Sequence, residues 1–239
     1  MTKYRIAVVG GTGPQGKGLA YRFAKHGHTV IIGSRTAEKA AISATEISDR
    51  LTGQADAGEV LFAQNSGAIE GADVVLLAVP YDGHDALVSS LDLAGKIVVS
   101  CVNPLAFDKR GAHGRIINNG DGSAAESAQH LAPDAAVAGA FHNVSATLLW
   151  GDDEFIDEDI LVVGDDIEAK AVAVDLAAAV SGRQGIDAGK LRLARQLEPF
   201  TAILISINRK YKTHSGVRIS GLQPQIQLRQ DRPLAAVDS

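Results

Sequence analysis

Buried-strand patterns alternate with helical patterns along the first 140 residues. The apolar, β-branched segment at residues 4–9 ends at Gly10-Gly11 and predicts a strand buried on both faces of a parallel sheet. Similar apolar runs predict strands at residues 29–32, 73–80, 96–101 and 135–141, with helices between them at residues 16–27, 37–51, 82–91 and 124–131. This alternation predicts an α/β fold with a doubly wound parallel sheet, the Rossmann architecture.

The composition of the chain changes after Trp150, where positions 152–159 contain six acidic residues and no basic residue. We therefore place a domain boundary there, between a first domain at residues 1–150 and a small C-terminal α/β part at residues 151–222. The second part is expected to contain a strand at residues 160–163 and helices at 167–180 and 191–210, the last one kinked at Pro199. Residues 223–239 are polar, contain two prolines and predict a loose tail.

Composition excludes several classes of protein. The chain has 239 residues, 46% of them hydrophobic and 21% charged, which are ordinary values for a globular protein with a full core. A formal net charge of −5 argues against binding to nucleic acid. The single Cys101 is expected to be a small core residue. A lone cysteine, the absence of a leader peptide and the absence of an apolar run long enough for a membrane span together predict a cytoplasmic protein.

A glycine-rich loop follows the first predicted strand. Gly11, Gly13 and Gly16 form G-x-G-x-x-G directly before a predicted helix, where the dinucleotide-binding fingerprint requires it. The first glycine permits a tight turn, the second lets the backbone approach a pyrophosphate, and the third lets the helix pack on the strand. The intervening residues of the loop are Thr12, Pro14 and Gln15. The loop therefore predicts a dinucleotide site rather than an unliganded turn.

The end of the second predicted strand indicates which dinucleotide binds. An acidic residue there would hydrogen-bond the 2′-hydroxyl of NAD and repel a 2′-phosphate, but the chain has Gly33-Ser34-Arg35-Thr36. Arg35 can pair with a 2′-phosphate, Ser34 can donate its hydroxyl, and Lys39 can add a second cation one turn later. We therefore predict NADP(H).

These segments carry a resemblance to a known family. The run from Gly10 to Ala20, followed by Ile32-Gly33-Ser34-Arg35, resembles the NADPH-dependent F420 reductases, also called F420H2:NADP oxidoreductases. Val79-Pro80 with His84 resembles the family's segment beside the nicotinamide, and residues 141–146 resemble the floor of its cleft. Residues 207–212 and Gly221-Leu222 are similar to the actinobacterial branch.

The resemblance implies a homodimer in which NADP(H) and coenzyme F420 meet in a cleft between the NADP-binding Rossmann domain and the small C-terminal part. It places cofactor contacts on a set of residues from both halves of the cleft: Thr12, Gly13, Pro14, Gln15, Ser34, Arg35, Lys39, Val79, Pro80, Asn143 and Ala146. Family members often have Asn-Leu where this chain has Pro14-Gln15, and proline removes one backbone donor from the pyrophosphate site. The tail after Leu222 is a second departure.

Hydride transfer between two cofactors needs alignment more than protein side-chain chemistry. The chain has no metal-ligand spacing, no nucleophile elbow and no Cys-His pair close in sequence. His84 and His142 each follow a predicted strand, so we name them as catalytic candidates that could hydrogen-bond the deazaflavin or manage a proton. The alternative for both is a capping or solvated histidine.

A basic run near the C-terminus could bind the polyglutamate tail of F420, although such runs usually form a solvated face. Its members are Arg209, Lys210, Lys212, Arg218, Arg229 and Arg232, and Asp231 is the only acidic residue among them.

Two other functions stay open. One is NADPH-dependent reduction of a small carbonyl or imine, which predicts a Tyr-x-x-x-Lys pair or a cleft lysine. The other is a redox sensor that binds NADP without turnover.

Overall fold

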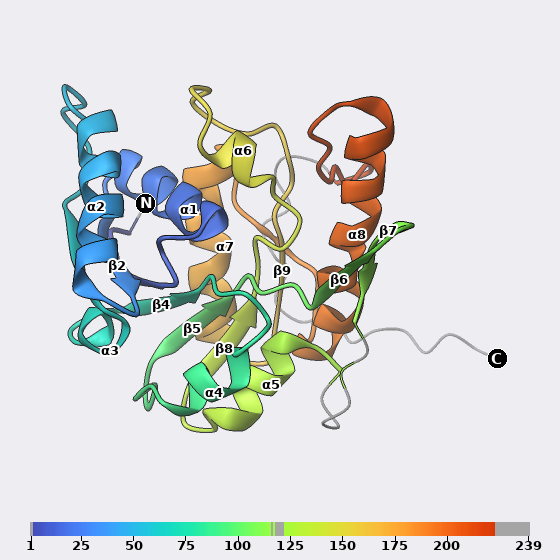
Figure 1. Ribbon diagram of the computed structural model, residues 1–239, viewed down its shortest axis with the longest axis horizontal. Coiled ribbons are helices and arrows are strands. Elements are labelled where there is room, and N and C mark those ends of the chain that lie inside the picture. Colours follow the sequence, from blue (N-terminus) through green and yellow to red (C-terminus); the bar gives the residue numbers. More distant parts are fainter. Residues whose placement is uncertain (1, 116, 118–121, 223–239) are drawn as a thin grey trace.

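The computed structural model describes residues 2–115, 117 and 122–222 and shows a sheet with helices on both faces (Figure 1). The strands are β1 (Arg5–Val9), β2 (Thr29–Ser34), β3 (Val60–Gln64), β4 (Val74–Leu77), β5 (Ile97–Ser100), β6 (Leu105–Asp108), β7 (Gly111–Gly114), β8 (Ala136–Gly139), β9 (Leu161–Gly164) and β10 (Ile186–Asp187). The helices are α1 (Pro14–Lys25), α2 (Ala37–Arg50), α3 (Asn65–Ile69), α4 (His84–Ser89), α5 (Ala124–Leu131), α6 (Ala146–Leu149), α7 (Ile167–Ser181), the 3-10 turn η1 (Leu191–Leu193) and α8 (Ala194–Tyr211).

Within the described residues, the main sheet has the order β10-β9-β8-β5-β4-β1-β2-β3. The six neighbouring strands β3, β2, β1, β4, β5 and β8 of this sheet are parallel, and β9 pairs with β8 in the antiparallel sense. The chain leaves β1 toward one edge of the sheet and returns at β4 toward the other, so the strand order reverses between these two strands. In open parallel sheets, ligands bind beyond the carboxyl ends of the strands at this reversal. The doubly wound fold is confirmed.

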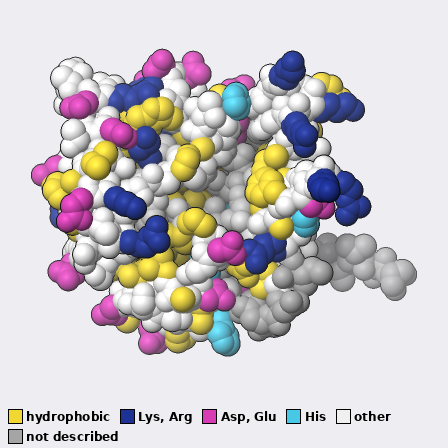
Figure 2. All heavy atoms as spheres, in the orientation of Figure 1, with side chains coloured by type: hydrophobic (Ala, Val, Ile, Leu, Met, Phe, Trp, Pro, Cys, Tyr) yellow, Lys and Arg dark blue, Asp and Glu magenta, His cyan; other side chains and the backbone are white. Residues whose placement is uncertain are grey.

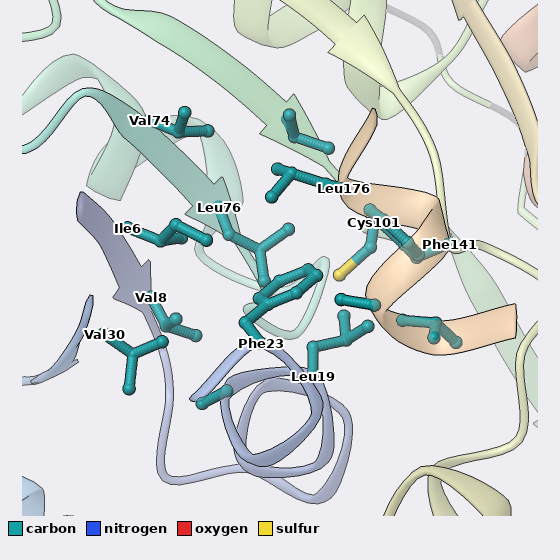
Figure 3. Packing of buried hydrophobic residues seen from close by; sticks show 14 of the residues in the cluster. Ile6, Val8, Leu19, Phe23, Val30, Val74, Leu76, Cys101, Phe141 and Leu176 are labelled. Carbon is teal, nitrogen blue, oxygen red and sulfur yellow. The ribbon is translucent and has the colours of Figure 1, made fainter. Parts of the chain in front are cut away.

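Two apolar layers hold the sheet because successive side chains of a strand point to opposite faces. Ile6 and Val8 pack with α1, α2 and α7, whereas Ala7 and Val9 pack with α3, α4 and α5. Figure 3 shows the first layer, where Phe23 of α1 lies close to the strand residues. Six parallel strands covered on both sides explain why the apolar runs in the sequence are continuous rather than alternating.

Several segments differ from the sequence predictions. The predicted strand at 73–80 ends at Leu77, so residues 78–80 leave the sheet before Pro80. The strand predicted to reach Phe141 ends at Gly139. The helix α8 continues through Pro199, where an interruption was expected. The hairpin β6–β7, the short helices α3 and α6 and the strand β10 were not predicted.

Four of the six acidic side chains after Trp150 form ion pairs with basic side chains from other elements. Arg50 pairs with Asp152, Lys25 with Glu154 at 2.7 Å, and Arg183 with Asp157 and Asp159 at 3.3 Å. Beyond this segment β9 extends the same sheet, so the sheet itself crosses the predicted boundary. The division at residue 150 stays a prediction, and the tail at 223–239 lies outside the described residues. No described helix is both long and apolar enough to cross a membrane.

Candidate functional site

A cleft of about 430 Å³ opens at the carboxyl edge of the sheet. One side is built from the segments that follow four parallel strands: residues 13–15 after β1, 78–80 after β4, 101–103 after β5 and 142–146 after β8. The opposite side comes from α8 and Ser215. Figure 2 shows the hollow between α8 and the rest of the molecule, with apolar side chains at its border. The cleft lies where the strand order predicts a ligand.

The glycine loop forms the entrance to α1 as predicted. Gly10 has φ +77, and a Cβ there would lie 2.6 Å from Val79 Cγ1, so both conformation and packing require glycine. A Cβ at Gly16 would lie 2.9 Å from the Gly10 carbonyl oxygen, which explains the close approach of the helix. Gly13 differs, because its nearest neighbour would be Gly10 O at 3.6 Å and it faces the cleft.

The start of α1 has the chemistry of an anion site. Pro14 occupies the first helical position, where its missing N–H costs least, and the N–H groups of the first turn have no partner within the helix. Residues 13–15 line the cleft, so this positive end of the helix faces it. A pyrophosphate placed here would accept hydrogen bonds from the backbone.

The predicted 2′-phosphate residues lie at the end of β2. Ser34 is 5% exposed as the last residue of the strand, whereas Arg35 and Lys39 are exposed. Within the described part of the chain neither cation has an ion-pair partner. Arg35 precedes α2 and Lys39 belongs to its first turn, where the Thr36 side chain accepts a hydrogen bond from Lys39 N at 3.4 Å. The geometry therefore leaves two cations available to a ligand phosphate.

Hydrogen bonds centred on Thr201 fix the floor of the cleft. The Thr201 hydroxyl donates to the His142 carbonyl oxygen at 2.8 Å and accepts from Asn103 Nδ2 and Asn143 Nδ2, each at 3.0 Å. Asn103 Nδ2 also donates to the His142 carbonyl at 2.7 Å. Because the hydroxyl uses its donor and both acceptor sites, it ties α8 to the ends of β5 and β8.

His142 lines the cleft, but its ring nitrogens do not face it. Asn103 donates through Nδ2, so its Oδ1 accepts from His142 Nδ1 at 3.1 Å. The buried Nε2 has no hydrogen-bond partner and lies 3.0 Å from the position of a Cβ on Gly139. Burial lowers the pKa of His142 to about 3, so the imidazole is neutral at physiological pH. The structure thus gives no geometric support to proton transfer by His142.

His84 does not line the cleft. It begins α4, is 0% exposed, and places Nδ1 2.8 Å from Asp85 Oδ1. A fully buried ring cannot touch a cofactor in this geometry, so the sequence prediction of a catalytic His84 has no support here. Its position after a strand was the correct signal for the sheet edge but did not reveal which way the side chain points.

Cys101 borders the cleft as a packed apolar residue. Its Sγ donates to the Leu77 carbonyl at 3.2 Å, and burial raises the pKa of the thiol to about 12, so no thiolate forms at physiological pH. Among the described residues that line the cleft, none carries an acidic side chain, a lysine or an arginine. These described residues can hold and align flat ring systems, and none of them is a charged general acid or base.

Of the predicted cofactor residues, Gly13, Pro14, Gln15, Val79, Pro80, Asn143 and Ala146 line the cleft, whereas Gly11, Thr12, Gly16, Ser34, Arg35 and Lys39 do not. Five polar residues of the lining were not predicted as cofactor contacts: Asn103, Ser145, Thr201, Asn208 and Ser215. Asn103 was recognisable because it follows a buried strand at the same edge. Thr201 had no local signal, since it lies within an apolar helix.

Comparison with known proteins agrees with this geometry. Residues 5–104 match the family model described as NADP oxidoreductase, coenzyme F420-dependent. The F420-dependent NADP reductase of Methanocaldococcus jannaschii is 40% identical over 222 residues, covering 92% of this chain and 99% of the relative. That of Methanothermobacter thermautotrophicus is 39% identical, covering 92% and 97%.

Solved structures show the same fold. A crystal structure from Arthrobacter sp. FB24, assigned as an F420-dependent NADP reductase, has a TM-score of 0.74 and 27% identity over 91% of this chain and 99% of its own. A pyrroline-5-carboxylate reductase from Streptococcus pyogenes has a TM-score of 0.58 at 14% identity, covering 88% and 66%, which shows a shared fold alone. With nearly full-length relatives at about 40% identity and the phosphate loop in place, the chain belongs to the F420-dependent NADP reductase family.

Proposed function

We propose that this protein transfers a hydride between NADP(H) and coenzyme F420 and so supplies either reduced F420 or NADPH. The observation that carries the proposal is a cleft without acidic, lysine or arginine side chains among its described lining residues, bordered by the phosphate loop on one side and α8 on the other. When both cofactors are bound, the nicotinamide C4 and the deazaflavin C5 supply the redox chemistry. The protein then needs to bind, align and exclude water, which this lining can do.

The residues divide into four binding regions under this proposal. The loop at residues 11–16 holds the pyrophosphate through backbone N–H groups, and Ser34, Arg35 and Lys39 hold the 2′-phosphate. Val79 and Pro80 form the wall behind the nicotinamide. Asn143 and Ala146 lie on the floor beside the deazaflavin. His142 also belongs to this floor, where its carbonyl oxygen accepts hydrogen bonds from Asn103 and from Thr201 of α8.

The experiment that tests the function mixes the protein with NADPH and oxidised F420 and follows the loss of deazaflavin absorbance and fluorescence. We expect rapid bleaching with NADPH and little with NADH. Binding of NADPH without bleaching would contradict the proposal and favour a redox sensor or another substrate. Reduction of a small carbonyl or imine is disfavoured because the described lining of the cleft contains neither lysine nor tyrosine.

Replacement of Arg35 tests the choice of NADP(H). We expect Arg35→Ala to raise KM for NADPH by about 10- to 100-fold, the loss of a charge-assisted hydrogen bond of roughly 1.5–3 kcal/mol. KM for NADH should change little, since NADH has no 2′-phosphate. Arg110→Ala is the matched control, because Arg110 is a 94% exposed arginine in the β6–β7 hairpin. Equal effects on NADPH and NADH would remove Arg35 from the 2′-phosphate site.

The basic run supports a weaker proposal for the polyglutamate tail of F420. Arg218 is paired with Asp157 and Asp159, and Arg229 and Arg232 lie outside the described residues, so Arg209, Lys210 and Lys212 remain at the end of α8. Figure 2 shows basic side chains gathered over this end of the helix. Asn208 and Ser215, which flank the three cations in the sequence, both line the cleft.

Salt dependence tests this role. Lys210→Ala/Lys212→Ala should weaken F420 binding by about 3- to 10-fold at low ionic strength, and the difference should shrink as salt screens exposed charges. The measurement is the F420 affinity at two salt concentrations, with the affinity for NADP⁺ as the internal control. Unchanged F420 affinity at low salt would contradict a role for these lysines.

We also propose that the protein is a cytoplasmic homodimer. The family resemblance suggests the dimer, and exposed apolar side chains on α8 and the adjoining hairpin support it. Phe107 is 70% exposed, Ile203 53% and Phe200 36%. Large apolar side chains at this exposure gain free energy when a second surface covers them. The molar mass in solution, measured by light scattering, tests the proposal, and the mass of a single chain would contradict it.

A further inference from the structure

The chain adopts a strained conformation at one buried residue of the cleft floor. Among the described residues other than glycine, only Phe141 and Lys212 have positive φ, at 63° and 53°. Lys212 lies at the exposed end of α8, where a left-handed residue commonly terminates a helix. Phe141 is 1% exposed and lies directly before His142 and Asn143. A bulky residue keeps this conformation only when its surroundings impose it.

Packing fixes the Phe141 ring. Its ring meets the edge of Phe23 at a centroid distance of 5.7 Å and an interplanar angle of 73°. Figure 3 shows Phe141 near Cys101 and Leu176, which come from the end of β5 and from α7. The ring is thus embedded in the core layer beneath the cleft, while the backbone of the same residue belongs to the floor.

A single side chain from the phosphate loop fixes the Phe141 backbone. Gln15 Nε2 donates to the Phe141 carbonyl oxygen at 3.2 Å, across 126 positions of sequence. Gln15 is the second residue of α1, so its own N–H belongs to the set that has no partner within the helix. Its backbone therefore faces the anion site while its side chain holds the floor.

We propose that Gln15 is a positioning residue that couples the NADP(H) site to the floor of the F420 site. Pyrophosphate bound at the first turn of α1 would fix the Gln15 backbone, and the side-chain amide would then fix the carbonyl of Phe141 and the orientation of residues 142 and 143. The two ligands bind more tightly together than apart, and the coupling is reciprocal. This inference rests on the proposed function, because it assigns the floor to F420.

The test uses a ligand without a nicotinamide, so that direct stacking between rings cannot produce the effect. 2′-Phospho-ADP-ribose carries both phosphate groups of NADP and leaves F420 oxidised. We expect it to tighten F420 binding to the wild type by about fivefold or more. In Gln15→Leu the tightening should fall below about twofold, measured at 2′-phospho-ADP-ribose concentrations that saturate each variant.

Two further variants separate coupling from general loosening. Gln15→Met, which also lacks the donor, should behave as Gln15→Leu does. Gln129→Leu removes another hydrogen bond from a glutamine side-chain amide to a backbone carbonyl. Gln129 Nε2 donates to the Ala135 carbonyl oxygen at 2.8 Å, and neither residue lines the cleft. It should lower the melting temperature and leave the coupling intact. Wild-type coupling in both Gln15 variants would overturn this inference but not the proposed function, and so would loss of coupling in Gln129→Leu. A wild-type protein that binds the nucleotide but not F420 would overturn the proposed function itself.

Discussion

Gly13→Ala should fold as the wild type does and lose most of its affinity for NADPH. The backbone of Gly13 has φ −76 and ψ 160, which any residue adopts, and an added Cβ would meet only the Gly10 carbonyl oxygen at 3.6 Å. The methyl group would instead project where the pyrophosphate must approach the backbone. We expect KM for NADPH to rise by about 10- to 100-fold, which corresponds to about 1.4–2.8 kcal/mol.

The control is the same substitution three residues earlier. Gly10→Ala forces a methyl group to 2.6 Å from Val79 Cγ1 at a φ of +77, so it should lower the melting temperature as well as activity. Gly13→Ala should leave the melting temperature unchanged or slightly raised, because alanine reduces the entropy of the unfolded chain. A Gly13→Ala protein with wild-type KM for NADPH would show that the dinucleotide does not approach this turn.

The sequence predicts the phosphate site well because the site is local. Six consecutive residues from Gly11 to Gly16 determine the turn, the close packing and the start of α1, and the absence of an acid near Ser34 needs no knowledge of tertiary structure. The parallel strands are equally accessible, since burial on both faces leaves continuous apolar runs. Each of these features depends on a short stretch of chain.

The floor of the cleft depends on distant contacts and could not be read in this way. Thr201 contacts Asn103 across 98 positions and Asn143 across 58, and nothing around Thr201 marks it as different from its apolar neighbours. The direction of a histidine side chain is also a tertiary property, so the sequence could not show that the side chains of His84 and His142 are both buried.

The β6–β7 hairpin was missed although its turn has a local signal. Asp108 Oδ1 accepts from the backbone N–H groups of Arg110 and Gly111, at 2.7 and 3.1 Å, and Gly111 has φ +129. An aspartate followed by glycine three residues later is typical of such turns. The flanking strands have only four residues each, too few for a clear alternating pattern.

Arg22→Met should destabilise the protein by a large fraction of its total stability. The Arg22 side chain is 0% exposed and donates to five backbone carbonyls, those of Leu148, Leu149, Gly151, Asp153 and Glu154. Methionine fills similar space but leaves these acceptors without a donor, at a cost of about 1–3 kcal/mol for each that stays buried. Because water can reach some of them, we expect a loss of about 3–5 kcal/mol in the free energy of unfolding.

Denaturant unfolding measures this loss, and Lys25→Met on the same helix is the control. The Lys25 side chain is 9% exposed, but its one ion pair with a described residue, at 2.7 Å, is with Glu154, whose side chain is 61% exposed and solvated, so the loss of this pair should cost only about 1 kcal/mol. A similar small loss in Arg22→Met would show that the carbonyls find other donors. The residues that Arg22 binds belong to α6, which begins at Ala146 in the cleft, and to the segment directly after it. A large loss would therefore also mean that a buried cation of α1 holds in place the segment that begins at Ala146, so that the helix which begins at the phosphate loop also supports the floor of the proposed hydride-transfer site.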